Sequence, residues 1–353
     1  MLEVSLSTMW AKGRFNGMSQ FAAKAKELGF THIEANASVS PQGLDELIKT
    51  SVPISSIHSP CPAVLSSKGT PVANLSLSSL DESEREEAVS FARKTIQLAS
   101  TIRAKAVVLH MGEVPINLSL QDKLHQLYNE NHTQTKEYSQ AKDELIHQRA
   151  SQVPPYLEAA RKSLEELSQY SQQQGILLGL ETRFYFHEIP NIDEMEILLN
   201  ASCHSEPSSF VIAVSRSPER SEREEKQSHL AQDKPCSERS ESIRKESVGY
   251  WHDVGHAEVN QRLGFTPHEE WLSRFNHKMI GVHLHDVIGI SDHRPPGKGT
   301  VNWDMVAKYL PYEIIRTCEI AEWNEEEEIQ GVVDFLQRKG LVDCLFCHPE
   351  PKP

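Results

Sequence analysis

The sequence predicts an α/β protein that folds as one (β/α)8 TIM barrel with two insertions. Eight short apolar runs alternate with segments of helical periodicity, which is the pattern of a parallel sheet whose strands are joined by helices. Most of these runs end in or beside a histidine, an aspartate or a glutamate, and barrel enzymes carry their chemistry at the carboxyl ends of the strands. A chain of 353 residues is long enough for a barrel of about 250 residues plus insertions.

The expected strands are short and rich in β-branched residues, as fully buried parallel strands are. They lie at residues 2–7, 31–35, 54–58, 105–110, 176–181, 248–253, 279–285 and 314–319. The last helix is expected from about Asn324 to Arg338, because glutamates fill its first turn and Gly340 follows its end. Eight alternations of strand and helix favour a closed barrel over an open sheet.

We expect residues 1–340 to form a single barrel domain, followed by a C-terminal tail at 341–353. Residues 114–152 are polar and helix-prone, and they predict an insertion over the barrel mouth. Residues 202–247 are rich in serine and charged residues, so this low-complexity insertion is predicted to be a disordered surface appendage. In the tail, the CxxCH spacing of Cys344, Cys347 and His348 matches covalent haem attachment, but we expect it to be incidental, since that chemistry requires export.

The composition argues against several classes of partner. A net charge of −14 repels polyanions and disfavours nucleic acid. No apolar run reaches the roughly 20 residues that cross a bilayer, and no signal peptide is visible, so we expect a cytoplasmic protein with no membrane partner. The six scattered cysteines fit reduced thiols. The oligomeric state is left open, and a homo-oligomer is compatible with the sequence.

Histidines and carboxylates at several strand ends predict a metal site at the barrel mouth. Strand ends that face one another bring ligands together from separate elements, which is what a catalytic metal site needs. Carboxylates and imidazoles without a thiolate suit a divalent ion such as Mn²⁺, Co²⁺, Mg²⁺ or Zn²⁺. The side chains concerned are His58, His110, Glu181, Asp253, His256, His283 and Glu319. Glu34 and His285 are expected to support the site from neighbouring positions.

The motifs at these strand ends resemble the xylose isomerase-like TIM barrels. This group includes sugar isomerases and epimerases and the apurinic endonucleases of the endonuclease-four type. The resemblance covers most of residues 1–340 outside the two insertions. It is carried by Ile57–Pro60, Leu109–Gly112, Leu180–Arg183, His252–His256, His283–Asp286, Asp292–His293 with Gly297–Gly299, and Cys318–Glu319.

The epimerase branch implies one divalent metal and a small carbohydrate-like substrate. By motif, the metal ligands would be Glu181, Asp253, His283 and Glu319. Of these, Glu181 and Glu319 would also be catalytic, exchanging a proton at the carbon beside the substrate carbonyl while an enediolate forms. The residues expected to bind a sugar, sugar phosphate or related hydroxy-carbonyl substrate are His58, His110, Arg183, His256, His293 and Lys298.

The endonuclease branch implies three zinc ions and cleavage of a phosphodiester in abasic DNA. Its additional ligands would fall on His58, His110, His256 and His293, with Asp292 nearby. Two features disagree with this alternative. Asp292 and His293 are adjacent, whereas the family separates the pair by one residue, and the mouth loops carry few basic residues. A third hypothesis is a degenerate barrel that only binds its ligand. The number of bound metal ions distinguishes the epimerase hypothesis from the endonuclease hypothesis.

Overall fold

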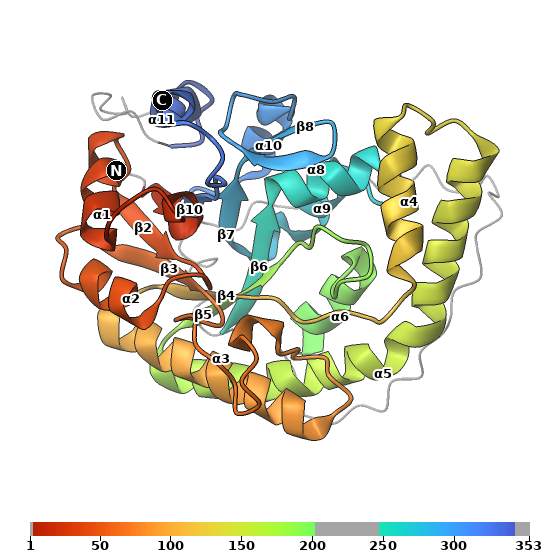
Figure 1. Ribbon diagram of the computed structural model, residues 1–353, viewed down its shortest axis with the longest axis horizontal. Helices are drawn as coiled ribbons and strands as arrows, with labels where there is room; N and C mark the ends of the chain where they lie inside the picture. The colour runs from red at the N-terminus through yellow and green to blue at the C-terminus, as the bar shows by residue number, and fades with distance from the viewer. Residues whose placement is uncertain (1–2, 202–246, 343–353) are drawn as a thin grey trace, which may run out of the picture.

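The computed structural model describes residues 3–201 and 247–342, and in these residues the strands form a closed eight-stranded barrel (Figure 1). The strands follow the order β1-β10-β7-β6-β5-β4-β3-β2, and every neighbouring pair is parallel. Their bounds are β1 Ser5–Ser7, β2 His32–Ala35, β3 Ile54–His58, β4 Ala106–Leu109, β5 Leu177–Glu181, β6 Val248–Asp253, β7 Met279–Leu284 and β10 Ile315–Cys318. The predicted (β/α)8 barrel is therefore confirmed.

Helices surround the barrel and cover the outer face of the strands (Figure 1). They are α1 Met18–Glu27, α2 Pro41–Ile48, α3 Glu82–Ile102, α4 Leu118–Asn129, α5 Lys136–Gln174, α6 Ile192–Ala201, α8 Val254–Arg262, α9 His268–Phe275, α10 Trp303–Tyr309, α11 Glu326–Ile329 and α12 Val332–Arg338. A small antiparallel hairpin follows β7, with strands β8 Asp286–Ile288 and β9 Ser291–Arg294. None of the helices in the two described ranges is both long and apolar enough to cross a membrane.

The expected last helix is two short helices, α11 and α12. Its start agrees with the expectation, because Glu325 and Glu328 form a capping box at the amino end of α11. Gly331 then has a φ of 84°, a left-handed conformation that glycine adopts readily and that interrupts the helix before α12 begins. The expectation of one continuous helix was wrong at this glycine.

Residues 114–152 form a helical pair rather than an isolated insertion. The first helix is α4, and the rest of the insertion is the amino-terminal part of α5, which continues without interruption to Gln174. Pro154 and Pro155 lie inside α5, where the missing N–H groups favour a bend, and α5 curves around the barrel in Figure 1.

The helical pair is attached to the barrel by buried polar contacts. The Tyr138 hydroxyl donates to the carbonyl of Leu263 at 3.0 Å, between α8 and α9. Arg149 is buried and pairs with Glu194 at the start of α6, with a distance of 2.5 Å between Nη1 and Oε1. These contacts hold the pair beside the mouth. None of the described residues lining the mouth pocket belongs to it, and the expectation of an insertion over the barrel mouth stays a prediction.

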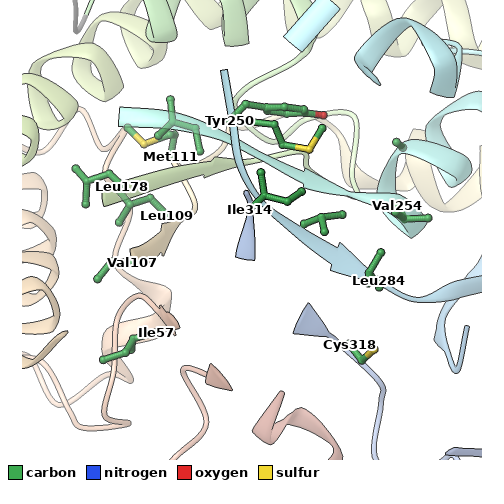
Figure 2. Packing of buried hydrophobic residues seen from close by; sticks show 14 of the residues in the cluster. Ile57, Val107, Leu109, Met111, Leu178, Tyr250, Val254, Leu284, Ile314 and Cys318 are labelled. Carbon is green, nitrogen blue, oxygen red and sulfur yellow. The ribbon is translucent and has the colours of Figure 1, made fainter. Parts of the chain in front are cut away.

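The apolar core has an outer and an inner part. The outer part fills the space between strands and helices, and Figure 2 shows some of it, including Ile57, Val107, Leu109 and Leu178. The inner part is the small cluster inside the barrel formed by Ala106, Val108, Trp251, Ile280 and Ile315. Side chains alternate along a strand, so polar residues an even number of positions after a member of this cluster also point into the barrel. Asp253, two residues after Trp251, is one of them. The inner cluster therefore lies below the polar residues at the strand ends.

Trp251 fills the barrel interior because its neighbours are glycines. A Cβ atom placed on Gly281 would lie 2.1 Å from Trp251 Cζ3, and one on Gly179 would lie 2.7 Å from Cε3. Cys61 and Cys318 are free and buried, as expected for reduced thiols. The low-complexity insertion falls outside the described residues except for residue 247. So does the tail from residue 343, with Cys344, Cys347 and His348. The expectations for these segments and for the 1–340 domain boundary stay predictions.

Candidate metal centre and active site

Four side chains expected to hold a metal converge at the carboxyl end of the barrel. Glu181 and Asp253 end β5 and β6, His283 lies in β7, and Glu319 directly follows β10. One ligand atom from each lies within 4.8 Å of the others, and all four side chains are buried. The set combines residues more than 130 positions apart in the chain, because parallel strands of one barrel end on the same face.

The geometry around His283 fits a divalent cation. Its Nδ1 lies 2.6 Å from Glu181 Oε1, and 3.4 Å from both Asp253 Oδ2 and Glu319 Oε2. One ring nitrogen cannot satisfy three buried carboxylates by hydrogen bonding, and their mutual repulsion needs a compensating charge. Three carboxylates and one imidazole suit Mn²⁺, Co²⁺, Mg²⁺ or Zn²⁺.

All three carboxylates are held in their ionised form. Burial alone would raise the pKa of Glu181, but His110 and His283 hold that pKa well below its usual range. Burial also opposes ionisation of Asp253, and the nearby His256 and His285 lower its pKa well below the ordinary value. Because metals bind the deprotonated carboxylate, this is the form a ligand set needs.

Glu34 sets the orientation of the His283 ring. Glu34 is fully buried, and its Oε1 and Oε2 atoms lie 3.2 Å and 3.3 Å from His283 Nε2. Ser56 Oγ donates to Glu34 Oε2 at 2.7 Å and fixes the carboxylate in turn. With an Nε2 proton directed to Glu34, the Nδ1 atom would be free to bind an ion held by the other carboxylates, as a metal ligand must. Glu34 therefore occupies the supporting position expected of it.

His285 supports Asp253 in a similar way. Its Nδ1 accepts the backbone N–H of His293 at 2.9 Å, so the ring proton is on Nε2. That Nε2 lies 2.8 Å and 3.0 Å from the two carboxylate oxygens of Asp253. Both ring nitrogens are used in these contacts, and through them His285 orients Asp253, while its ring also belongs to a candidate ligand group with His256 and His293.

A second group of donors shares Glu181 with the first. Glu181 Oε2 lies 2.6 Å from His110 Nε2 and 3.4 Å from His58 Nε2, while the opposite oxygen faces His283. The His58 and His110 rings meet edge to face at 4.4 Å. His58, His110 and Glu181 can therefore hold an ion of their own, with Glu181 as a bridging carboxylate, or they can bind substrate oxygens.

A third group lies beside the hairpin β8–β9. His256 donates from Nδ1 to the carbonyl of Thr182 at 2.9 Å, and its Nε2 lies 3.5 Å from Asp292 Oδ2. That oxygen of Asp292 is buried and has no hydrogen-bond partner. His293 Nδ1 lies 3.0 Å from the other carboxylate oxygen, and its Nε2 lies 3.4 Å from Glu319 Oε2. The sequence spacing of Asp292 and His293 thus still lets both side chains face His256.

Arg183 is committed to two carboxylates. Its Nη1 donates to Glu181 Oε2 at 2.6 Å, and its Nη2 donates to Glu188 Oε1 at 2.5 Å. Glu188 lies in the loop after β5, and its role was not foreseen because no spacing in the sequence links it to a strand end. Burial opposes ionisation of Glu188, yet Arg183 lowers its pKa. Arg183 lies at the site as expected, but its charge is already paired.

Lys298 lies outside the pocket. Its side chain is exposed, and it is not among the described residues that line the mouth. The expectation that Lys298 binds substrate gains no support from this position and stays a prediction. The Gly-Lys-Gly turn instead folds around the buried carboxylate of Asp286, which accepts the N–H of Gly297 at 2.9 Å.

A pocket of about 680 Å³ opens above the donor groups. Its polar lining includes His58, His110, Glu181, His256, His293 and Glu319. Phe184 and Tyr185 form an aromatic wall of the pocket, which is also lined by Met9, Ala37, Pro60 and Ala73. His125 of α4 stacks against Tyr185 with 6.1 Å between ring centroids, so the helical pair supports this wall. The volume suits a small molecule.

Comparison with solved structures places the fold among known barrels. No protein-family model matches the chain, and no curated protein does. A D-tagatose 3-epimerase-like protein is 16% identical with a TM-score of 0.58, and 96% of this chain and 97% of that chain are covered. The D-psicose 3-epimerase from Clostridium cellulolyticum H10 is 13% identical with a TM-score of 0.60, and the match covers 96% of this chain and 99% of that chain. The IolI protein with a zinc atom is 11% identical with a TM-score of 0.57, and the match covers 96% of this chain and 98% of that chain. At such identities the likeness concerns the fold alone, and the chain shares the (β/α)8 barrel fold of these proteins.

Proposed function

We propose that the protein is a divalent-metal-dependent isomerase or epimerase of a small sugar, sugar phosphate or related hydroxy-carbonyl compound. The observation that carries this proposal is the pair Glu181 and Glu319. Both carboxylates are buried, both line the pocket, and both belong to the same four-ligand group. Two carboxylates around one reacting carbon can remove a proton on one side and return it on the other.

The chain's own residues would carry the proton transfer. Burial opposes ionisation of Glu319, but the charges of His283 and His293 lower its pKa, so it is available as a base. Arg183 and His110 both contact Glu181 Oε2 and hold that carboxylate in place. His256 lines the same pocket, and its Nε2 atom can form a hydrogen bond with a substrate hydroxyl.

The divalent ion would be held by Glu181, Asp253, His283 and Glu319. When bound, it would polarise the substrate carbonyl and offset the negative charge that develops as the neighbouring carbon loses its proton. The compared structures support this proposal, because their names include a D-psicose 3-epimerase and a barrel protein with a zinc atom.

Solvent exchange tests the proposal directly. The purified chain is loaded with Mn²⁺ and incubated with ketoses in heavy water, and deuterium at the carbon beside the carbonyl is followed by NMR. We expect exchange with at least one ketose, and loss by a factor of about 10² or more in Glu319→Gln. Asp304→Asn, which changes an exposed carboxylate on α10, is the matched control. Exchange that is unchanged in Glu319→Gln would contradict the assigned role.

A second candidate, multi-metal phosphodiester hydrolysis, is favoured by one specific observation. Glu181 belongs to both the first and the second donor group, and His293 of the third group lies 3.4 Å from Glu319 of the first. Elemental analysis separates the candidates, since the epimerase proposal expects one tightly bound ion per chain and the hydrolase expects about three. Cleavage of a duplex that contains an abasic-site analogue would establish the hydrolase and overturn the epimerase proposal.

A further inference from the structure

We propose that the substrate of this pocket is an unphosphorylated, uncharged polyhydroxy-carbonyl compound, and that Asp286 fills the position where a barrel of this kind would bind a phosphate group. This inference rests on the proposed isomerase or epimerase function and narrows its substrate class. Three independent features carry it: the turn after β7, the pairing of the charges in the pocket, and the aromatic wall.

The turn after β7 is built around an internal anion. Barrels often bind phosphate with backbone N–H groups of the loops after the seventh and eighth strands. Here the buried carboxylate of Asp286 takes those donors. Its Oδ2 accepts from Gly297 N–H and Trp303 Nε1, each at 2.9 Å, and its Oδ1 accepts from Val301 N–H at 3.0 Å.

The same turn has no room for a second anion. A Cβ atom added to Gly299 would lie 2.3 Å from Asp286 Oδ1 and 2.5 Å from the carbonyl oxygen of Val287. The N–H of Val287 also donates to Asp286 Oδ1, so four donors converge on this one carboxylate. A phosphate would have to displace a fully buried side chain that already satisfies the turn.

No positive charge among the described lining residues is left for a phosphate. Arg183 is the one lysine or arginine among them, and Glu181 and Glu188 engage its guanidinium. His293 lies between the carboxylates of Asp292 and Glu319. A phosphate dianion would meet four carboxylates in this pocket, and the charges that could attract it are already paired with them.

The aromatic wall of the pocket suits carbon-bound hydrogens. Phe184 and Tyr185 meet edge to face at 4.7 Å, and Phe184 also packs against the His256 ring at 5.7 Å. Met9 and Pro60 also line the pocket. The C–H face of a sugar or cyclic polyol can pack on such a wall while its oxygens bind the histidines and carboxylates. A phosphate placed on this wall would lose water and gain no positive charge from it.

Matched pairs of substrates test this inference. The Mn²⁺-loaded full chain is given D-fructose and D-fructose 6-phosphate, D-tagatose and D-tagatose 6-phosphate, and D-ribulose and D-ribulose 5-phosphate, and deuterium exchange is measured for each. We expect exchange with an unphosphorylated member and a kcat/KM at least about 100-fold lower for its phosphate ester. Comparable or faster exchange of the ester overturns this inference and leaves the proposed function intact. Absence of exchange from every pair contradicts the proposed function and, with it, this inference.

Two variants test which part of the protein distinguishes the unphosphorylated substrate from its phosphate ester. Lys298→Ala is expected to leave the kcat/KM of both members of a pair within about twofold, since Lys298 lies outside the pocket. A drop confined to the ester would show that the turn binds phosphate and would overturn the inference. Tyr185→Ala is expected to raise the KM of the unphosphorylated substrate several-fold with little change in kcat, because uniform binding is lost. Tyr312→Ala, exposed before β10, is the matched control, and equal effects of the two tyrosine variants would count against the wall.

Discussion

Glu34 and His283 form a buried pair in which the histidine Nε2 lies 3.2 Å from a carboxylate oxygen, on the side of the ring away from the candidate metal ligands. This contact links β2 to β7, two strands that are not neighbours in the barrel. It provides an acceptor for the Nε2 proton, which would leave Nδ1 free to bind an ion. A histidine without that partner could rotate or change tautomer, and its Nδ1 would no longer be held toward the ion.

We predict that Glu34→Ala weakens metal binding by a factor of about 10 to 100, the usual effect of losing the partner of a histidine ligand. The measurement is the affinity of the apoprotein for Mn²⁺ in competition with a chelator, so it does not depend on turnover. Glu34→Gln, whose amide oxygen can still accept the Nε2 proton, should recover much of the affinity. A Glu34→Ala variant that binds Mn²⁺ as tightly as the unchanged protein would show that His283 needs no such partner.

The residues at the strand ends could be predicted from the sequence because the carboxyl ends of parallel strands all lie on one face of the barrel. Seven of the eight expected strands agree with the observed ones to within one residue at each end, and the first begins three residues later than expected, at Ser5. The parity of side chains sends Glu181, Asp253 and His283 to the same interior. The long polar insertion was harder, since nothing in its composition says where α4 and α5 pack. The continuity of α5 through Pro154 and Pro155 runs against the usual effect of proline on helices.

The roles of Arg183, Lys298 and Glu188 could not be read from the sequence. A motif says that an arginine follows Glu181 by two residues, but the identity of its partner depends on how the loop after β5 folds back. Likewise, a Gly-Lys-Gly turn is compatible with phosphate binding until the position of Asp286 is known. The partner of a charged loop residue depends on tertiary contacts, and the sequence does not show which distant segments come together in the fold.

Metal addition should stabilise the protein by mass action, because the ligand set is assembled only in the folded state. At a free Mn²⁺ concentration of 100 times Kd, one site contributes about 2.7 kcal/mol to the free energy of unfolding. The check is a thermal melt of chelator-treated protein with and without added Mn²⁺, which should show a higher Tm with metal. The rise should be largely abolished in Asp253→Asn. A Tm independent of Mn²⁺ in the unchanged protein would contradict the assignment of the four-ligand group.

Arg149 should be important for stability although it does not itself line the pocket. Its guanidinium is buried between α5 and α6, where it pairs with Glu194 and donates to the carbonyl of Glu188 at 2.9 Å. Arg149→Met leaves the Glu194 carboxylate buried without its partner, and we expect the free energy of unfolding to fall by about 3–5 kcal/mol. Arg161→Met, which breaks an exposed pair with Glu158 on the same helix, should cost under about 1 kcal/mol. Urea denaturation measures both variants, and similar losses would refute the argument from burial.

Gly281 should be irreplaceable as long as Trp251 fills the barrel. Alanine at position 281 would place its Cβ 2.1 Å from Trp251 Cζ3, and the inner cluster has no space for the indole to move. We expect Gly281→Ala to lower the free energy of unfolding by about 1–3 kcal/mol through overpacking. It should also weaken Mn²⁺ binding, because the indole packs against the His283 ring at 5.3 Å. Adding Trp251→Phe makes room, so the double variant should be more stable than the sum of the two single effects predicts. Strict additivity would show that the two side chains do not compete for the same space.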